Sequence, residues 1–368
     1  MKSKDNWNET HDRFIAWWKG DLHESPLISL ITKRDTPRGA LETVPQGQAG
    51  EHYFSDMPAV LANFRNSLRQ RNFDLDSYPS LDLNFGPGSM ALYLGSEPIF
   101  SPETVWFNPC VFEENGGWEN FALKYDPNNH WWKEHLRIHK EAVEAAQGEF
   151  YVNIPDIVEN MDILAAMYNS EALCLDLLEN PDIIKKRLEE LNELFFIYYD
   201  AFYDMLKDEK GGSSFTAFRI WGPGKTCKVQ CDFNVLMSPA HFREFVCPTL
   251  ADQCARLDNT IFHLDGPDAI RHAQALMEIP HLDGLQWTPG AAHPDGGDEC
   301  WYPLYDIVHE AGKRLWVYLE DGDADTMVQK ARKLVNRYGH KGLYINVLRE
   351  FDEREADVII KAAAKGFR

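Results

Sequence analysis

The segment FHLDG, residues 262–266, holds the pair of side chains best suited to chemistry in this sequence. His263 and Asp265 are two positions apart, so both side chains point to the same face if the segment is a β-strand. An imidazole and a carboxylate on one face can bind a divalent metal such as zinc, or can act as an acid–base pair. The structural alternative is a hydrogen bond between the two groups inside a packed core.

A regular alternation of strands and helices must position this pair. Eight short runs rich in β-branched and aromatic residues predict strands, and amphipathic segments such as 56–71, 181–206 and 238–257 predict helices between them. The predicted strands are 26–32, 80–85, 149–154, 214–221, 260–265, 284–288, 314–320 and 342–347. This order predicts a single α/β domain, residues 1–368, whose parallel sheet closes into a (β/α)8 barrel. An open doubly wound sheet is the alternative, and residues 86–148 are expected to form an insertion over the barrel mouth.

Polar and aromatic residues stand near the carboxyl ends of the predicted strands, and a barrel builds its active site from those ends. Besides the pair at 263 and 265, these positions hold Asp82 and Glu320. The candidates for binding a substrate are Arg34, Arg38, Asn84, Asn153, Trp221, Trp287, Tyr318 and Asn346. Loop capping explains some of these residues in any barrel, but a whole ring of them favours a pocket for a small molecule.

Charge and cysteine usage restrict the function classes. The chain of 368 residues has 37 basic and 58 acidic residues and a formal net charge of −21 at pH 7. So negative a chain repels phosphate backbones and anionic lipid surfaces, which argues against nucleic acids and membranes as partners. No apolar run reaches the roughly 20 residues of a membrane span. The seven scattered cysteines and the absence of an apolar leader predict a reduced protein of the cytoplasm.

Four motifs give the chain a family resemblance. They are HLDG at 263–266, where the family carries H-x-C-G, MSPAHFREFVCPTL at 237–250, ENPDIIKKRLEELNELF at 179–195 and SLDLNFGPGSMALYLG at 80–95. On these motifs the chain resembles the uroporphyrinogen decarboxylase and cobalamin/coenzyme M methyltransferase superfamily along most of its length. The resemblance implies a (β/α)8 barrel, which is also the fold that the strand pattern predicts.

The resemblance also implies a metal site that departs from that of the family's methyltransferases. Their zinc is held by H-x-C and a distal cysteine, whereas this sequence has Asp265 at the first cysteine and Asn346 near the second. The implied zinc ligands are therefore His263 and Asp265, with Glu320 or Cys231. Such harder ligands suit an oxygen-containing substrate better than a thiol.

The family's decarboxylases differ from this sequence in other positions. Their arginine-rich segment is reduced here to Arg34 and Arg38, and the histidine of their eighth strand is absent from 342–351. Asp82 falls near their ring-binding aspartate. A decarboxylase would use Asp82 to stabilise a cationic ring and the two arginines to bind carboxylates, without a cofactor.

We therefore expect a methyltransferase that moves a methyl group from a small O-methyl or similar substrate to a corrinoid on a partner protein. His263 and Asp265 would bind a metal or protonate the leaving atom, because a bare alkoxide leaves poorly. A decarboxylase of a tetrapyrrole or another electron-rich ring is the first alternative, and a non-catalytic binding barrel is the second. Barrels of this family often dimerise, so a homodimer is a further expectation.

Overall fold

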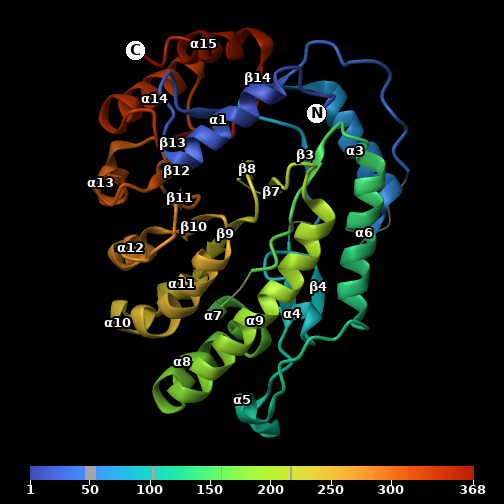
Figure 1. Ribbon diagram of the computed structural model, residues 1–368, viewed down its shortest axis with the longest axis vertical. Helices are drawn as coiled ribbons and strands as arrows, with labels where there is room; N and C mark the ends of the chain where they lie inside the picture. Colours follow the sequence, from blue (N-terminus) through green and yellow to red (C-terminus); the bar gives the residue numbers. More distant parts are fainter. Residues whose placement is uncertain (46–54, 102–103, 159, 216–217) are drawn as a thin grey trace.

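The computed structural model describes residues 1–45, 55–101, 104–158, 160–215 and 218–368, and its centre is a mainly parallel sheet (Figure 1). The strands of this sheet are β1 Leu27–Lys33, β2 Arg71–Leu75, β9 Thr226–Gln230, β10 Asn259–Asp265, β11 Gly284–Thr288, β12 Arg314–Leu319, β13 Leu343–Val347 and β14 Phe351–Asp352. Seven of them follow one another in the hydrogen-bonded order β14-β1-β13-β12-β11-β10-β9, and every neighbouring pair is parallel. Only β2 joins this sheet antiparallel, through β1.

Four shorter strands pair outside this sheet. They are β3 Ser80–Leu81, β6 Tyr151–Val152, β7 Ser213–Phe215 and β8 Ile220–Gly222. β3 pairs parallel with β6, and a parallel bridge joins Ile154 to Phe215. Among the described residues, backbone pairing does not run unbroken from β9 round to β1. The fold is thus mixed α/β with a mainly parallel sheet of the kind found in TIM-like barrels, and complete closure stays a prediction.

The fourth strand differs from the sequence prediction. The predicted strand 214–221, whose residues 216–217 lie outside the described residues, is replaced by β7 and β8, which pair antiparallel. The strand that pairs with β10 is instead β9, Thr226–Gln230. The prediction was wrong here because Lys228 and Gln230 make β9 look polar, although both side chains are buried.

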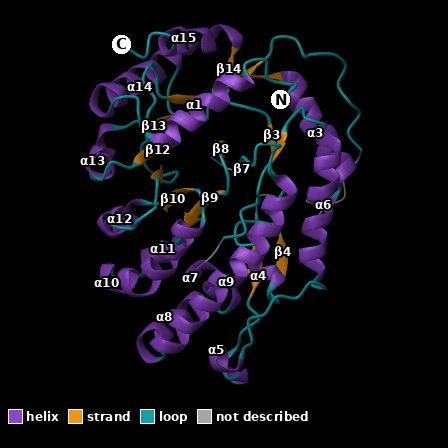
Figure 2. Ribbon diagram, viewed as in Figure 1, coloured by secondary structure: helices purple, strands orange, loops and turns teal. Residues whose placement is uncertain are grey.

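Helices form the outer layer of the molecule (Figure 2). They are α1 Trp7–Lys19, α3 Met57–Gln70, α4 Met90–Tyr93, α5 Gly117–Asn120, α6 His130–Ala146, α7 Asn160–Met167, α8 Ser170–Glu179, α9 Pro181–Leu206, α10 Pro239–His241, α11 Cys247–Arg256, α12 Ala273–Met277, α13 Tyr302–Glu310, α14 Ala324–Tyr338 and α15 Glu353–Ala363. Among the described helices, none is long and apolar enough to cross a membrane.

The segment 86–148, expected as an insertion, is only partly separate from the main layers. Within it, β4 Glu97–Phe100 pairs antiparallel with β5 Val105–Asn108, while residues 102–103 lie outside the described residues. Its longest helix, α6, packs against α3 and β6. That helix therefore belongs to the layer that covers the sheet.

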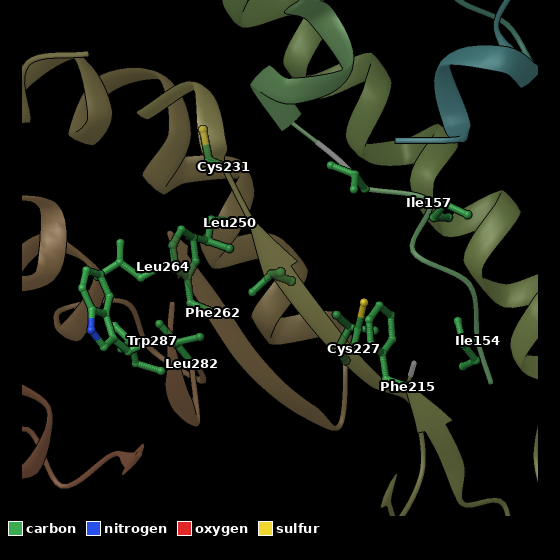
Figure 3. Packing of buried hydrophobic residues seen from close by; sticks show 14 of the residues in the cluster. Ile154, Ile157, Phe215, Cys227, Cys231, Leu250, Phe262, Leu264, Leu282 and Trp287 are labelled. Atoms are coloured by element: carbon green, nitrogen blue, oxygen red, sulfur yellow. The ribbon is translucent and has the colours of Figure 1, made fainter. Parts of the chain in front are cut away.

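The main core lies between the strands and these helices. Figure 3 shows Phe262 and Leu264 of β10 among the core side chains, together with Leu250 of α11 and Trp287 of β11. Because neighbouring side chains of a strand point to opposite faces, the residues between them point to the inner face. The helix-covered core thus fixes the inward orientation of His263.

A second core cluster lies beneath α1. Trp7, Phe14 and Trp17 of α1 pack with Leu27 at the start of β1 and with inner residues of the other strands, namely Ile261, Trp316 and Tyr344. The indole of Trp18 donates a hydrogen bond to the Trp221 carbonyl oxygen at 2.9 Å. The amino-terminal helix therefore covers the amino-terminal end of the sheet, opposite the strand ends where barrel chemistry is found.

Candidate active site

His263 is held in one orientation by the neighbouring strand. Its Nδ1 atom forms a short hydrogen bond with Oε1 of Gln286, which occupies the directly paired position of β11. The Gln286 amide nitrogen donates to Oγ1 of Thr288 at 2.8 Å, so the amide oxygen is the atom that faces the imidazole. An oxygen that only accepts requires a proton on Nδ1. The Nε2 atom of His263 therefore carries a lone pair.

The surroundings of His263 keep the imidazole neutral. Burial and the nearby Lys228 ammonium lower its pKa to about 4, against smaller raising effects of Gln286 and nearby carboxylates. The ring of Phe218 lies over it, with 5.2 Å between ring centroids and 35° between the planes. At neutral pH this histidine is uncharged, and its unprotonated ring nitrogen can accept a hydrogen bond.

Lys228 brings a positive charge into the sheet interior. Its side chain is only 2% exposed, and its Nζ atom lies 2.5 Å from Oδ2 of Asp156. The same ammonium also donates to the side-chain oxygen of Gln230. Charge-assisted hydrogen bonds of this kind stabilise an ammonium that burial alone would penalise. The pair places a fixed dipole beside His263.

Two further carboxylates stand just beyond the end of β9. Asp162 of α7 accepts hydrogen bonds from the backbone nitrogens of Asp232 and Phe233, each at 2.8 Å. The Gln230 amide nitrogen lies between the two aspartates, 3.3 Å from Asp162 Oδ2 and 3.2 Å from Asp232 Oδ2. Burial and then the Asp232 charge raise the pKa of Asp162 to about 7, and burial raises the pKa of Asp232 to about 6. Near neutral pH the pair therefore retains a proton that it can donate.

On another side of the sheet interior, Arg219 reaches toward β1 and β13. Its Nη1 atom donates to Ser29 Oγ at 3.4 Å and to Asn346 Oδ1 at 3.2 Å. Asn346 is fully buried, and its Nδ2 atom has no hydrogen-bond partner among the described residues. The side chains at this position therefore offer more hydrogen-bond donors than acceptors.

Several predicted site residues are gathered near His263. Asp265 follows it on the inner face of β10, and Tyr318 is half-buried on β12. Burial, and then the carboxylates of Glu320, Asp295 and Asp265, raise the pKa of Tyr318 to about 12. Glu320 is exposed, and its backbone nitrogen donates to Asp295 Oδ2 at 2.7 Å.

The two predicted tryptophans lie elsewhere. Trp287 packs in the helix-covered core, with its ring centroid 5.1 Å from that of Trp301. Trp221 lies beneath α1, where its ring is 4.4 Å from that of His11. Both side chains are almost completely buried, so the structure gives them a packing role.

Three polar candidates make contacts within the region of β3 and β6. Asn84 donates to Asp82 Oδ2 at 2.9 Å in the loop after β3, and Asp82 is exposed there. Asn153 is buried and accepts a hydrogen bond from Ser214 at 2.5 Å. It ties β6 to β7 and so supports the inner face.

Arg34 and Arg38 line a different cavity. This pocket of about 560 Å³ lies between the amino-terminal segment, α3 and β2, and none of its lining residues belongs to β9, β10, β11 or β12. Arg38 is exposed, while Arg34 donates to the Arg71 carbonyl oxygen at 3.1 Å. The two arginines are therefore not gathered with the His263 group.

The expected zinc ligands do not come together. Cys231 belongs to the helix-covered core, where Figure 3 shows it, whereas His263 points to the inner face. Within the described ranges, no group of three or more His, Cys, Asp and Glu side chains has a geometry that could hold a metal ion. Among the described residues, the donor set therefore does not fit a zinc ion.

Five residues of this site are not among the residues predicted from the sequence. They are Lys228, Gln230, Gln286, Asp162 and Arg219. A signal was present for three of them, since polar side chains alternate with apolar ones in TCKVQC and in GLQWT. Period-two alternation indicates a strand with one polar face.

Comparison with known proteins supports the fold. No family model matches the chain, and no curated protein sequence matches it significantly. Among solved structures, a methyltransferase from Methanosarcina mazei superposes with a TM-score of 0.61, over 97% of this chain and 98% of that chain, at 14% identity. A B12-independent methionine synthase from a Shewanella species is similar with a TM-score of 0.48, over 94% and 95% of the chains, at 9% identity. The first likeness shows that the two chains share a fold over nearly their whole length.

Proposed function

We propose that this chain is a methyltransferase that takes a methyl group from a small O-methyl or similar compound and passes it to a corrinoid on a partner protein. One observation carries the proposal. The bonded pair of His263 and Gln286 lies on the inner face of β10 and β11, and Lys228 of β9, paired with Asp156, acts on it by its charge, in a fold shared with a methyltransferase. Strand ends of such sheets are where barrel enzymes place their reacting groups.

The chemistry requires a proton for the leaving oxygen. When the bond between methyl carbon and oxygen breaks, its electron pair stays on oxygen, and an alkoxide is a poor leaving group. The Asp162–Asp232 pair retains a proton near neutral pH and can supply it. The corrinoid, when bound, supplies the electron pair that takes up the methyl group.

The neutral histidine orients the substrate in this scheme. With its Nδ1 proton directed to Gln286, His263 presents the Nε2 lone pair to the interior. That lone pair can accept a hydrogen bond from a water molecule, whose second hydrogen can be donated to the ether oxygen of the substrate and so align it. Burial and then the nearby Lys228 charge oppose protonation and keep the imidazole in this neutral form.

A reduced corrinoid assay tests the proposal. The purified protein is mixed with cob(I)alamin and a panel of methoxylated compounds, and methylcobalamin formation is followed by absorbance. We expect turnover with at least one compound and a loss of about 10²–10⁴-fold in rate for His263→Ala. The exposed His293→Ala serves as the matched control. No turnover across the panel, or equal rates for both variants, would contradict the proposal.

A further inference from the structure

Arg219 is a largely buried charge that has no counter-ion among the described residues. Its guanidinium contacts only the neutral side chains of Ser29 and Asn346, and none of the carboxylates in the described part of the chain forms an ion pair with it. The carboxylate of Glu350, whose charge favours the protonated form of Arg219, is already bonded to Arg71 at 2.6 Å. A guanidinium stays protonated at neutral pH, so burial without a partner is costly.

Asn346 adds a second unsatisfied donor at the same place. Its Oδ1 atom accepts from Arg219, which orients the amide so that Nδ2 is directed away from that bond. That nitrogen is buried and has no partner among the described residues. Buried polar groups normally find a partner, and an orphan donor indicates an acceptor that the chain does not itself supply.

The backbone holds Arg219 in place at a cost. Its φ angle of 53° lies in the left-handed region, which is unfavourable for a residue with a side chain. Two buried aromatic groups fix this conformation: the Tyr344 hydroxyl donates to the Arg219 carbonyl oxygen at 2.8 Å, and the Trp316 indole donates to that of Phe218 at 3.1 Å. Strain that neighbouring residues maintain is a feature of ligand sites.

From these contacts we infer that Arg219 and Asn346 form a binding site for the carboxylate group of an organic acid. The planar guanidinium and the amide nitrogen offer several donors in one place, which suits the two oxygens of a carboxylate. Phe218 links this position to His263, because its ring lies over the imidazole and its backbone is adjacent to that of Arg219. The inference rests on the proposed function for one point only: the acid would be the methylated substrate.

Binding of short carboxylic acids tests the inference without any methyl transfer. Acetate, methoxyacetate, 3-methoxypropanoate and 3-methoxybenzoate are titrated into the protein by calorimetry, each beside its uncharged amide. We expect at least one acid to bind about tenfold or more tightly than its amide, as charge-assisted hydrogen bonds predict. If no acid is preferred over its amide, the inference is overturned. Methyl transfer can fail while this preference holds, so the two proposals are separately testable.

Three variants test whether the preference for an acid over its amide arises at Arg219 and Asn346. Arg219→Met removes the charge, and Asn346→Asp supplies a counter-ion from within the chain, so both are expected to abolish the preference while thermal stability stays equal or rises. The exposed Arg38→Met is the control for loss of one arginine, and it should keep the preference. A preference that survives in Asn346→Asp, or that disappears in Arg38→Met, would place the acid elsewhere and overturn the inference.

Discussion

His263 Nδ1 and Gln286 Oε1 meet across β10 and β11, at positions paired directly in the sheet. This relationship fixes the imidazole tautomer through a neutral amide. A carboxylate in the same place would raise the pKa of the histidine, whereas the amide leaves the imidazole uncharged at neutral pH.

Replacing Gln286 tests that relationship. Gln286→Leu removes the acceptor for the Nδ1 proton, so we expect a second tautomer with the proton on Nε2, which nitrogen-15 NMR of the histidine ring detects. Under the proposed function, methyl transfer should fall by about 10–100-fold, as for other residues that orient a reacting group. Gln329→Leu changes an exposed glutamine and should alter neither signal nor rate. An unchanged tautomer in Gln286→Leu would show that other contacts hold the ring.

Breaking the Lys228–Asp156 pair should destabilise the fold. Lys228→Met leaves the Asp156 carboxylate, only 15% exposed, without its partner, and the expected cost is about 3–5 kcal/mol in the free energy of unfolding. Denaturant titration measures this loss. The double variant Lys228→Met with Asp156→Leu removes both charges and should recover most of it. If the double variant is as unstable as the single one, the loss comes from packing.

The Asp162–Asp232 pair should make stability depend on pH in a defined direction. Both pKa values are raised in the folded protein, to about 7 and about 6, so folding favours the protonated pair. The pair's contribution to stability is therefore largest at acidic pH and declines as the pH rises through those values.

Asp232→Asn removes one of the two interacting charges. We expect a higher melting temperature than that of the unmodified protein at pH 8, and a smaller difference at pH 5, where the pair is protonated. Thermal denaturation at both pH values provides the measurement. Asp35→Asn, at an exposed carboxylate, is the control. A difference of equal size at both pH values would argue against charge repulsion between the pair.

Trp287 distinguishes a packing role from a binding role. The side chain is fully buried in the helix-covered core, so Trp287→Ala should lower the free energy of unfolding by about 3–5 kcal/mol. Trp106→Ala removes an indole that is 65% exposed and should change it by less than about 0.5 kcal/mol. A Trp287→Ala protein with normal stability but impaired substrate binding would instead support the binding role that the sequence predicts for Trp287.

Local patterns in the sequence were sufficient to predict most of the strands and the direction of His263. The run FHLD alternates apolar and polar residues, and burial of its apolar members on the helix side determines where the imidazole points. The prediction failed at β11, where Gln286 and Trp287 are neighbours and an aromatic residue looked more suited to a pocket. The helix layer takes the larger apolar side chain because burying it there is more favourable.

The partners of the buried charges could not be predicted from sequence order. Lys228 and Asp156 are 72 positions apart, and Asp162 meets Asp232 only because α7 lies against the turn after β9. The position of the Arg219 side chain depends on a left-handed backbone conformation. An arginine in the sequence does not indicate that conformation. Such groups meet through tertiary packing, which a pattern within one element does not contain.

The packing of α1 against the amino-terminal strand ends would have a kinetic consequence under the proposed function. Tryptophan side chains of α1 cover that end, so the methyl donor and a large protein acceptor would both approach from the opposite side. A docked carrier would then block the smaller molecule from arriving or leaving. The proposed function therefore predicts compulsory-order kinetics, with the donor entering first and the demethylated product departing only after the carrier has moved away.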